Sequence, residues 1–394
     1  MGNHSIIPPS SAKIWGAPGG CTGWVVMSQM YPETEPNEEA IEGEASHEIG
    51  EKLIRYNAVG KISGNKASDF TGKTAENGVI FTDEMFEAAE IYANDVADVM
   101  RSAGVFGGPC LGIEQRIEAK KIHDLSFGTT DAFIFDRTTG HLYIWDYKFG
   151  YEIVEAFENW QAINYLAGIF ELLGLDNGIA DQHITVHIRI VQPRAHHRDG
   201  VIREWVTTGS DLRAHFNTLE MNAAEALGPN AKCRSGSHCR HCTARANCEA
   251  ALTAGMRLYE VVTKPVPLEL SPLAAGVQLS MIKRARKQLE YLESGFEEQI
   301  KGKIRKGITF PNWSVEQGMG RERWAKPVAE VIALGSLYGK DLKKPDDVIT
   351  PNQARKKGMD ADVIKSYSEK PKTGMILVED NGDKAKRLFG ENKS

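Results

Sequence analysis

The chain has no long apolar run, and nowhere does one approach the roughly 20 residues that a membrane-spanning helix needs. Its first residues, MGNHSIIPPSSAK, lack the basic start and long apolar core of a signal peptide. It also lacks internal repeats and low-complexity tracts. With 394 residues, of which 41% are hydrophobic and 25% charged, these absences predict a soluble, cytoplasmic, globular protein with a sizeable core.

An excess of positive charge is also lacking, because the formal net charge is −6, and this argues at first against a nucleic-acid partner. The total hides an asymmetry. Residues 265–394 hold 24 Lys and Arg against 18 Asp and Glu, whereas residues 1–264 hold 23 against 35. An acidic body with a more basic C-terminal part is compatible with a metal site and a separate phosphate-contacting surface. The prolines of KPVPLELSP mark a linker-like boundary, so we expect two domains, 1–264 and 265–394.

The period of the apolar residues predicts the order of the elements. Helical spacing predicts helices over 38–58, 82–103, 154–173, 209–227, 249–262 and 275–306. Alternation predicts strands over 111–121, 127–136, 141–149, 182–192 and 201–206, and a further strand lies within ITFPNWSVEQG. Thr82 is the expected cap of its helix, and DRTTG is the expected turn of a hairpin between the second and third strands.

The stretch LYIWDYKFG, residues 142–150, places two charges at the end of an apolar strand. Asp146 and Lys148 point the same way because alternate strand residues share a face, and Asp131 lies on the hairpin partner. Tyr147 faces the opposite side, which leaves its backbone carbonyl free. Carboxylate and carbonyl oxygens are the ligands that Mg²⁺ prefers, and a neighbouring lysine can orient a water. The alternative is a buried Asp–Lys ion pair that closes the hairpin.

Two helices carry further polar residues at helical spacing. EGEASHEIGE places Gly43, His47 and Glu51 on nearly one face, and NWQAINYLAG does the same for Gln161 and Tyr165. The order is therefore GxxxHxxxE, GxxD, DxK and QxxxY. These motifs, over residues 40–170, resemble those of the RecB-type branch of the PD-(D/E)XK nucleases. The resemblance implies an α/β fold with a mixed central sheet flanked by helices, and an α+β C-terminal extension.

The resemblance implies roles for individual residues. His47, Asp131 and Asp146 match the positions that bind Mg²⁺ or Mn²⁺, with the Tyr147 carbonyl as a further ligand, and Lys148 matches the catalytic lysine. Gln161 and Tyr165 match the motif that positions the substrate strand. Glu114 lies where some members carry an additional acid, and its alternative is an exposed strand residue. Glu44 and Glu51 flank His47, either as groups that contact the metal ligands or as solvated charges.

The cysteines give a second signal. KCRSGSHCRHCTARANCEA contains Cys233, Cys239, Cys242 and Cys248, and thiolates this close repel one another unless a cation neutralises them. These four predict a local zinc site. In AddB-like and CRISPR-associated relatives of the resembled family, CxxC-x5-C joins a cysteine before the nuclease core to hold a [4Fe–4S] cluster. That comparison implies the set Cys21, Cys239, Cys242 and Cys248, which we favour, and leaves Cys233 and Cys110 unused.

The resemblance predicts a Mg²⁺- or Mn²⁺-dependent deoxyribonuclease, more an exonuclease at duplex ends than an endonuclease, acting in phage recombination or DNA processing. Its expected partners are duplex ends or single-stranded DNA and a phage single-strand-annealing protein, and a homo-oligomer stays open. The alternative is a non-catalytic DNA-end-binding or recruitment module on the same fold. Basic clusters at both ends of helix 275–306 are phosphate contacts or a solvated helix face.

Overall fold

The computed structural model describes residues 5–32, 38–60, 66–175, 183–265, 269–319, 323–344, 347–370 and 372–379. The chain divides into two compact units, Met1–Gly295 and Phe296–Ser394. The functional division expected between residues 264 and 265 stays a prediction. Among the described helices, none is long and apolar enough to cross a membrane.

The first unit contains the helices and the sheet that position the candidate site. Its strands are β1 (Leu111–Glu118), β2 (Phe127–Asp136), β3 (His141–Tyr147), β4 (Thr185–Val191) and β5 (Ile202–Thr208). Its α-helices are α1 (Ala12–Trp15), α2 (Trp24–Met30), α3 (Glu38–Ala58), α4 (Asp83–Ala103), α5 (Trp160–Leu173), α6 (Gly209–Leu227), α7 (Glu249–Val262) and α8 (Pro272–Arg305), the last of which continues into the second unit. Its 3₁₀ helices are η1 (Pro9–Ser11), η2 (Ala67–Asp69), η3 (Gly108–Cys110), η5 (Ser237–His241) and η6 (Arg245–Asn247).

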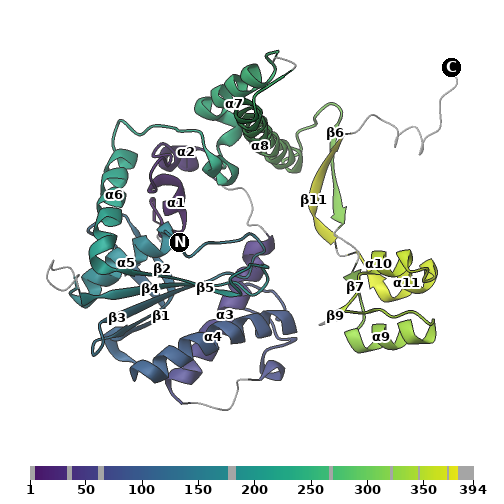
Figure 1. The fold of residues 1–394 in the computed structure, drawn as a ribbon, viewed down its shortest axis with the longest axis horizontal. Coiled ribbons are helices and arrows are strands. Elements are labelled where there is room, and N and C mark those ends of the chain that lie inside the picture. The colour runs from purple at the N-terminus through teal and green to yellow at the C-terminus, as the bar shows by residue number, and fades with distance from the viewer. Residues whose placement is uncertain are drawn as a thin grey trace. The chain divides into compact units, whose positions relative to one another are not determined.

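The five strands form one mixed sheet in the order β1-β2-β3-β4-β5. The neighbours β3 and β4 run parallel, and the other three pairs are antiparallel. A parallel pair needs a crossover, which here includes α5. Helices α3 and α4 cover one face of the sheet, while α5, α6 and the N-terminal helices cover the other (Figure 1). The expected mixed α/β arrangement, a sheet flanked by helices, is confirmed.

Alternation along β2 and β3 sends side chains to two separate cores. Phe133 and Ile144 pack with α5 and α6, whereas Ile134, Trp145 and Tyr147 pack with α3 and α4. Because successive strand residues point to opposite faces, one short hairpin anchors both helical layers. Its turn is held by the side chain of Asp136, whose Oδ1 accepts the N–H of Thr138 at 2.8 Å.

Two helix boundaries show what the apolar pattern does and does not fix. Helix α4 begins after Thr82, whose side chain accepts the N–H of Met85 as expected for a cap. Helix α5 begins at Trp160, and the predicted start at residue 154 is wrong. Asn159 caps α5 by accepting the N–H of Ala162, and residues 154–159 form a non-helical approach. The late start places Gln161 in the first turn of α5, beside the end of β3.

The second unit is smaller and mixed. Its elements are β6 (Trp313–Met319), β7 (Arg323–Trp324), α9 (Val328–Leu337), β8 (Lys343–Lys344), β9 (Asp347–Val348), α10 (Pro351–Lys356), α11 (Ala361–Tyr367), β10 (Ser368–Glu369) and β11 (Lys372–Glu379). The strands pair as three antiparallel two-stranded ladders, β6 with β11, β7 with β10 and β8 with β9. A small core of Val331, Leu334, Ala354 and Ile364 joins α9, α10 and α11.

Candidate functional site

Three candidate ligands from three elements converge in the first unit. His47 lies on α3, Glu114 on β1 and Asp131 on β2, and one ligand atom of each lies within 4.8 Å of the others. The Nδ1 of His47 is 3.6 Å from a carboxylate oxygen of Glu114 and 3.6 Å from one of Asp131. All three side chains are partly exposed, so a cation from solvent can reach them.

The backbone at Glu114 departs from an ordinary strand. Glu114 has a φ of 43°, in the left-handed region that residues other than glycine seldom adopt. The β1–β2 ladder pairs Ile113 with Ala132 and Gln115 with Thr130, and passes over Glu114 between them. Such strain collects at functional sites. In this backbone conformation, the Glu114 carboxylate lies on the side of His47.

Strands β2 and β3 stop pairing beside the site. Their ladder ends at Ala132 and Trp145, so the N–H of Tyr147 has no strand partner on the β2 side. Asp131 supplies one, because its Oδ2 accepts this N–H at 2.6 Å while its Oδ1 faces His47. Asp131 therefore holds the opened hairpin and presents one carboxylate oxygen to the candidate metal position.

Asp146, Lys148 and Gln161 form a second group on the α5 side of the sheet. The Oδ1 of Asp146 accepts hydrogen bonds from Lys148 Nζ at 2.8 Å and from Gln161 Nε2 at 2.9 Å. The other oxygen, Oδ2, is fully buried and has no hydrogen-bond partner among the described residues. A buried carboxylate oxygen without a donor is unfavourable unless a cation or water satisfies it.

The electrostatics of the site favour a bound cation. Burial raises the pKa of Asp131 and of Asp146, and Asp146 is raised further by the charge of Asp131. Burial would lower the pKa of Lys148, but the charges of Asp146 and Asp131 outweigh it and raise that pKa. Burial likewise opposes the charged form of His47, while Asp131 and Glu114 raise its pKa. A divalent cation bound among these acidic side chains would offset the burial that disfavours their charged forms.

A pair of stacked tyrosines lies behind His47, and the sequence pattern gave no sign of it. The ring of Tyr147 is 5.0 Å from that of His47 and stacks on Tyr92 at 4.9 Å with an interplanar angle of 3°. Its hydroxyl bonds to that of Ser46 at 2.7 Å. The Tyr147 side chain thus faces away from Asp146, as alternation predicts, and supports the histidine. Tyr92 falls in the apolar stripe of α4, where its spacing looks like ordinary core.

The remaining predicted residues lie at different depths around the site. Tyr165 is buried on α5, and burial followed by the charge of Asp131 raises the pKa of its hydroxyl. Glu51 pairs with Arg55 at 2.8 Å, and Arg55 donates to the carbonyl of Ile113 next to Glu114. Glu44 points to the exposed loop, where Asn77 donates to it at 3.4 Å.

Cys21 lies against the distant cysteine-rich segment. Its Sγ accepts the N–H of Arg234 at 3.3 Å, and the neighbouring Gly23 N–H donates to the carbonyl of Lys232 at 2.9 Å. The thiols of Cys21 and Cys248 are close enough to Cys233 to affect its pKa, which burial and these neighbours raise to about 12. Burial, together with the neighbours Cys239, Cys21 and Cys248, raises the pKa of Cys242 to about 11. The fold therefore brings five cysteines into one region.

The spacing of these sulfurs bears on which metal they suit. All six cysteines are described, and no three of their sulfurs lie within 4.8 Å of one another. Around one zinc ion, Zn–S bonds of about 2.3 Å place the sulfurs about 3.8 Å apart. The ligands of a [4Fe–4S] cube bind different irons and lie farther apart. Cys110 is elsewhere, accepting a hydrogen bond from Arg137 at 3.1 Å.

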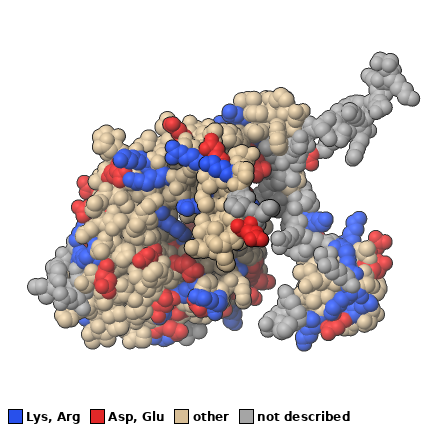
Figure 2. Space-filling view, turned by 45° about the horizontal axis from the view of Figure 1, so that its top comes forward, with Lys and Arg blue, Asp and Glu red and all other residues tan. Residues whose placement is uncertain are grey.

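The described charged side chains are mixed in sign on the face of the molecule that Figure 2 shows. On α8, Arg286 pairs with Glu290 at 2.7 Å, so part of the basic cluster expected to contact phosphates is neutralised within the helix.

Comparisons with known proteins place the chain in one family. A family model described as "Protein of unknown function (DUF2800)" matches residues 4–384, nearly the whole chain. The searches of curated proteins and of solved structures found no match.

Proposed function

The chain belongs to the DUF2800 family, and we propose that this member is a Mg²⁺- or Mn²⁺-dependent deoxyribonuclease with a PD-(D/E)XK core that acts at DNA ends. The observation that carries the proposal is the buried, partnerless Oδ2 of Asp146 close to the converging His47, Glu114 and Asp131. If Asp146 and Lys148 formed an ion pair that only closed the hairpin, we would expect no buried carboxylate oxygen without a partner at Asp146. We would also expect no histidine between two acidic side chains beside it.

The residues present fit a hard divalent cation. His47, Glu114, Asp131 and the Oδ2 of Asp146 supply one nitrogen and carboxylate oxygens, and the Tyr147 carbonyl completes the proposed set. Such a cation polarises a phosphodiester and lowers the pKa of a bound water. Glu114 enters the ligand set by geometry, where the motif alone left its role open.

Lys148 and Gln161 act on the substrate side. Lys148 Nζ donates to Asp146 Oδ1 at 2.8 Å and to the side-chain amide oxygen of Gln161 at 3.4 Å, so these two bonds hold its ammonium in place. A fixed ammonium stabilises the charge that develops on the phosphate and orients the attacking water. The side-chain amide of Gln161 contacts both Asp146 and Lys148, and so it helps to fix the position of the Lys148 ammonium.

The cysteines are proposed to hold a [4Fe–4S] cluster through Cys21, Cys239, Cys242 and Cys248. The support is the approach of Cys21 to the cysteine-rich segment, where it acts on the pKa of both Cys233 and Cys242. The cluster's role is structural, because phosphodiester hydrolysis transfers no electrons. Zinc held by Cys233, Cys239, Cys242 and Cys248 is the alternative, and metal analysis of purified protein decides between them.

The test is cleavage of end-labelled linear duplex with Mg²⁺ or Mn²⁺, compared with covalently closed circular DNA. We expect linear DNA to be degraded and circular DNA to survive. Lys148→Met should lower the cleavage rate about 100-fold or more while Mn²⁺ binding persists. The matched control is Lys52→Met, which changes a lysine that pairs with Glu48 on α3.

Asp146→Asn should lose both cleavage and Mn²⁺ binding. If the wild-type protein binds Mn²⁺ and DNA ends but leaves linear DNA intact, the nuclease proposal fails. The non-catalytic end-binding module is then the better description.

A further inference from the structure

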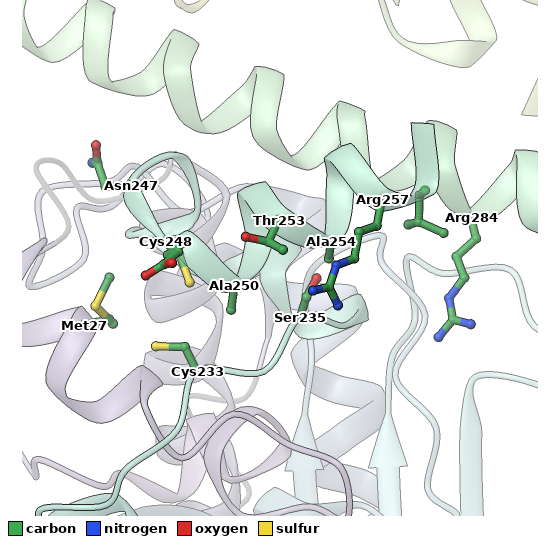
Figure 3. A pocket seen from close by; sticks show the side chains of 12 residues that line it. Met27, Cys233, Ser235, Asn247, Cys248, Ala250, Thr253, Ala254, Arg257 and Arg284 are labelled. Carbon is green, nitrogen blue, oxygen red and sulfur yellow. The ribbon is translucent and has the colours of Figure 1, made fainter. Parts of the chain in front are cut away.

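A pocket of about 890 Å³ lies beside the cysteines and outside the nuclease site. One face of α7 lines it, together with residues from α2, the cysteine-rich loop and α8 (Figure 3). Of the clustered cysteines only Cys233 and Cys248 reach it, so the pocket lies next to the sulfur cluster and not within it. Its volume is in the range of small-ligand pockets.

The two ends of the pocket differ chemically. Glu249 and Arg257 line it at opposite ends of the same face of α7, about 12 Å apart at 1.5 Å per residue. Arg284 of α8 and the hydroxyl-bearing Ser235 and Thr253 line it as well. Arg257 and Arg284 both line the pocket, and Figure 3 shows both guanidinium groups directed away from their helices.

Within the described part of the chain, no ion pair or hydrogen bond joins the side chain of Arg257 or Arg284 to another residue. This contrasts with Arg286, two residues from Arg284, which pairs with Glu290 at 2.7 Å. Two unpaired guanidinium groups on different helices facing one pocket form a site for an anion, and their planar forks match phosphate oxygens.

The wall between the ends is apolar. Ala250, Ala254 and Leu258 present small or aliphatic side chains along α7, and Met27 lies opposite with its polarisable sulfur. A flat ring can rest on such a surface, and thioethers contact aromatic faces favourably. An acidic peptide would use the arginines but would gain little from this wall.

We propose that the pocket binds one nucleotide of a single DNA strand, with its phosphate at Arg257 and Arg284 and its base on the apolar wall. The identity of the ligand as DNA rests on the proposed function, whereas the phosphate chemistry rests on the pocket alone. The site would hold a strand at a position separate from the cleavage residues.

The experiment measures binding of fluorescent oligothymidine to the purified full-length protein in EDTA, so that cleavage does not intervene. The double variant Arg257→Gln/Arg284→Gln should bind about tenfold more weakly and with a shallower dependence on salt. Arg286→Gln is the matched control and should bind like the wild type. Both changed arginines are exposed and unpaired, so the melting temperature should not move.

Competitors identify the ligand. Unlabelled oligothymidine should displace the probe, free thymidine monophosphate should do so only at much higher concentration, and oligoglutamate should not. The proposal is overturned if the double variant and the control bind the probe equally well. It is also overturned if oligoglutamate displaces the probe at the same total negative charge as oligothymidine. If the wild-type protein binds the strand through these arginines but does not cleave DNA, only the nuclease assignment is overturned.

Discussion

At the scale of single residues, two stacked tyrosines differ in one hydrogen bond. Tyr147 bonds through its hydroxyl to Ser46, whereas the hydroxyl of Tyr92 is buried and has no partner among the described residues. Tyr92 is only 1% exposed, and burial followed by the charges of Asp131 and Glu114 holds its pKa well above the ordinary value. The phenol therefore stays neutral beside the acidic site.

This difference predicts opposite effects of the same substitution. Tyr92→Phe removes an unsatisfied buried hydroxyl and should raise the free energy of unfolding by about 1 kcal/mol. Tyr147→Phe removes the 2.7 Å bond to Ser46, whose hydroxyl then keeps only a longer bond of 3.4 Å to the Met85 carbonyl, so it should lower the free energy of unfolding by about 1 kcal/mol. Urea denaturation of both variants measures the two signs. A destabilised Tyr92→Phe would mean that a buried water satisfies the Tyr92 hydroxyl in the protein.

At the scale of elements, two helical glycines have opposite surroundings. A Cβ at Gly168 of α5 would lie 2.5 Å from Ile117 Cγ2 and 2.6 Å from the carbonyl oxygen of Glu118. A Cβ at Gly43 of α3 would meet nothing within 4 Å. The glycine at 168 lets α5 approach β1 closely, and α5 also carries Gln161 toward Asp146.

Alanine at these two positions should therefore act in opposite directions. Gly168→Ala forces α5 away from β1 and should cost about 2 kcal/mol or more, with a lower cleavage rate as Gln161 moves. Gly43→Ala only reduces the freedom of the unfolded chain and should stabilise by up to about 1 kcal/mol. Thermal unfolding of the pair measures this contrast. Equal effects at the two positions would contradict the close α5–β1 approach.

The strands β3, β4 and β5 carry a polar cluster whose stability should depend on pH. His187 bonds to His141 at 2.8 Å and to Glu204 at 3.0 Å, and Arg189 donates to Glu204 at 2.7 Å. Burial lowers the pKa of His187, despite the opposing effect of Glu204. Burial alone would raise the pKa of Glu204, but the hydrogen bond and charge of Arg189 lower it.

Both shifts weaken the fold in acid. A histidine whose pKa is lowered by folding contributes stability above its unfolded pKa of about 6.5 and loses it as the pH falls below that value. Glu204 contributes stability above its unfolded pKa and loses it at still lower pH. His187→Gln should therefore flatten the fall in melting temperature between about pH 7 and pH 5 by a few degrees. His196→Gln, at an exposed histidine, is the control and should keep the wild-type slope.

Many of the helix and turn boundaries follow from the sequence, because local signals determine them. Thr82 marks the start of α4, and Asp136 with its following residues marks the β2–β3 turn. The start of α5 was predicted six residues early because the apolar spacing continues through residues 154–159, while the capping bond of Asn159 carries no spacing signal. The left-handed φ of Glu114 had no signal either, since strain of this kind depends on contacts across the sheet.

At the scale of the whole molecule, the candidate sites depend on contacts that spacing cannot give. The motif order suggested that His47 and Asp131 meet, but the 3.6 Å approach arises from how α3 packs on the sheet. The pocket arginines, one on α7 and one in the basic cluster of α8, come to line one pocket only through folding. Cys21 is 213 residues from Arg234, whose N–H it accepts.

The contact at Cys21 ties the start of the first unit to the segment after its sheet. Closing so long a loop costs chain entropy, and a cluster that bridges its ends offsets that cost in the folded state. If the proposed [4Fe–4S] assignment holds, Cys21→Ser should therefore lose at least half of the bound iron and the broad absorption near about 400 nm, and should unfold at a melting temperature several degrees lower. Iron analysis, absorption and thermal unfolding of anaerobically purified protein measure these effects.

Cys110→Ser is the matched control for this change, because Cys110 contacts Arg137 away from the cluster and should keep the full iron content. Cys233→Ser separates the two ligand sets. If Cys233→Ser strips the metal while Cys21→Ser keeps it, the metal is held within residues 233–248 alone, and the N-terminal contact at Cys21 is then a packing contact without metal. If Cys21→Ser strips the metal and Cys233→Ser does not, one cluster spans the first unit from its N-terminal segment to the start of α7.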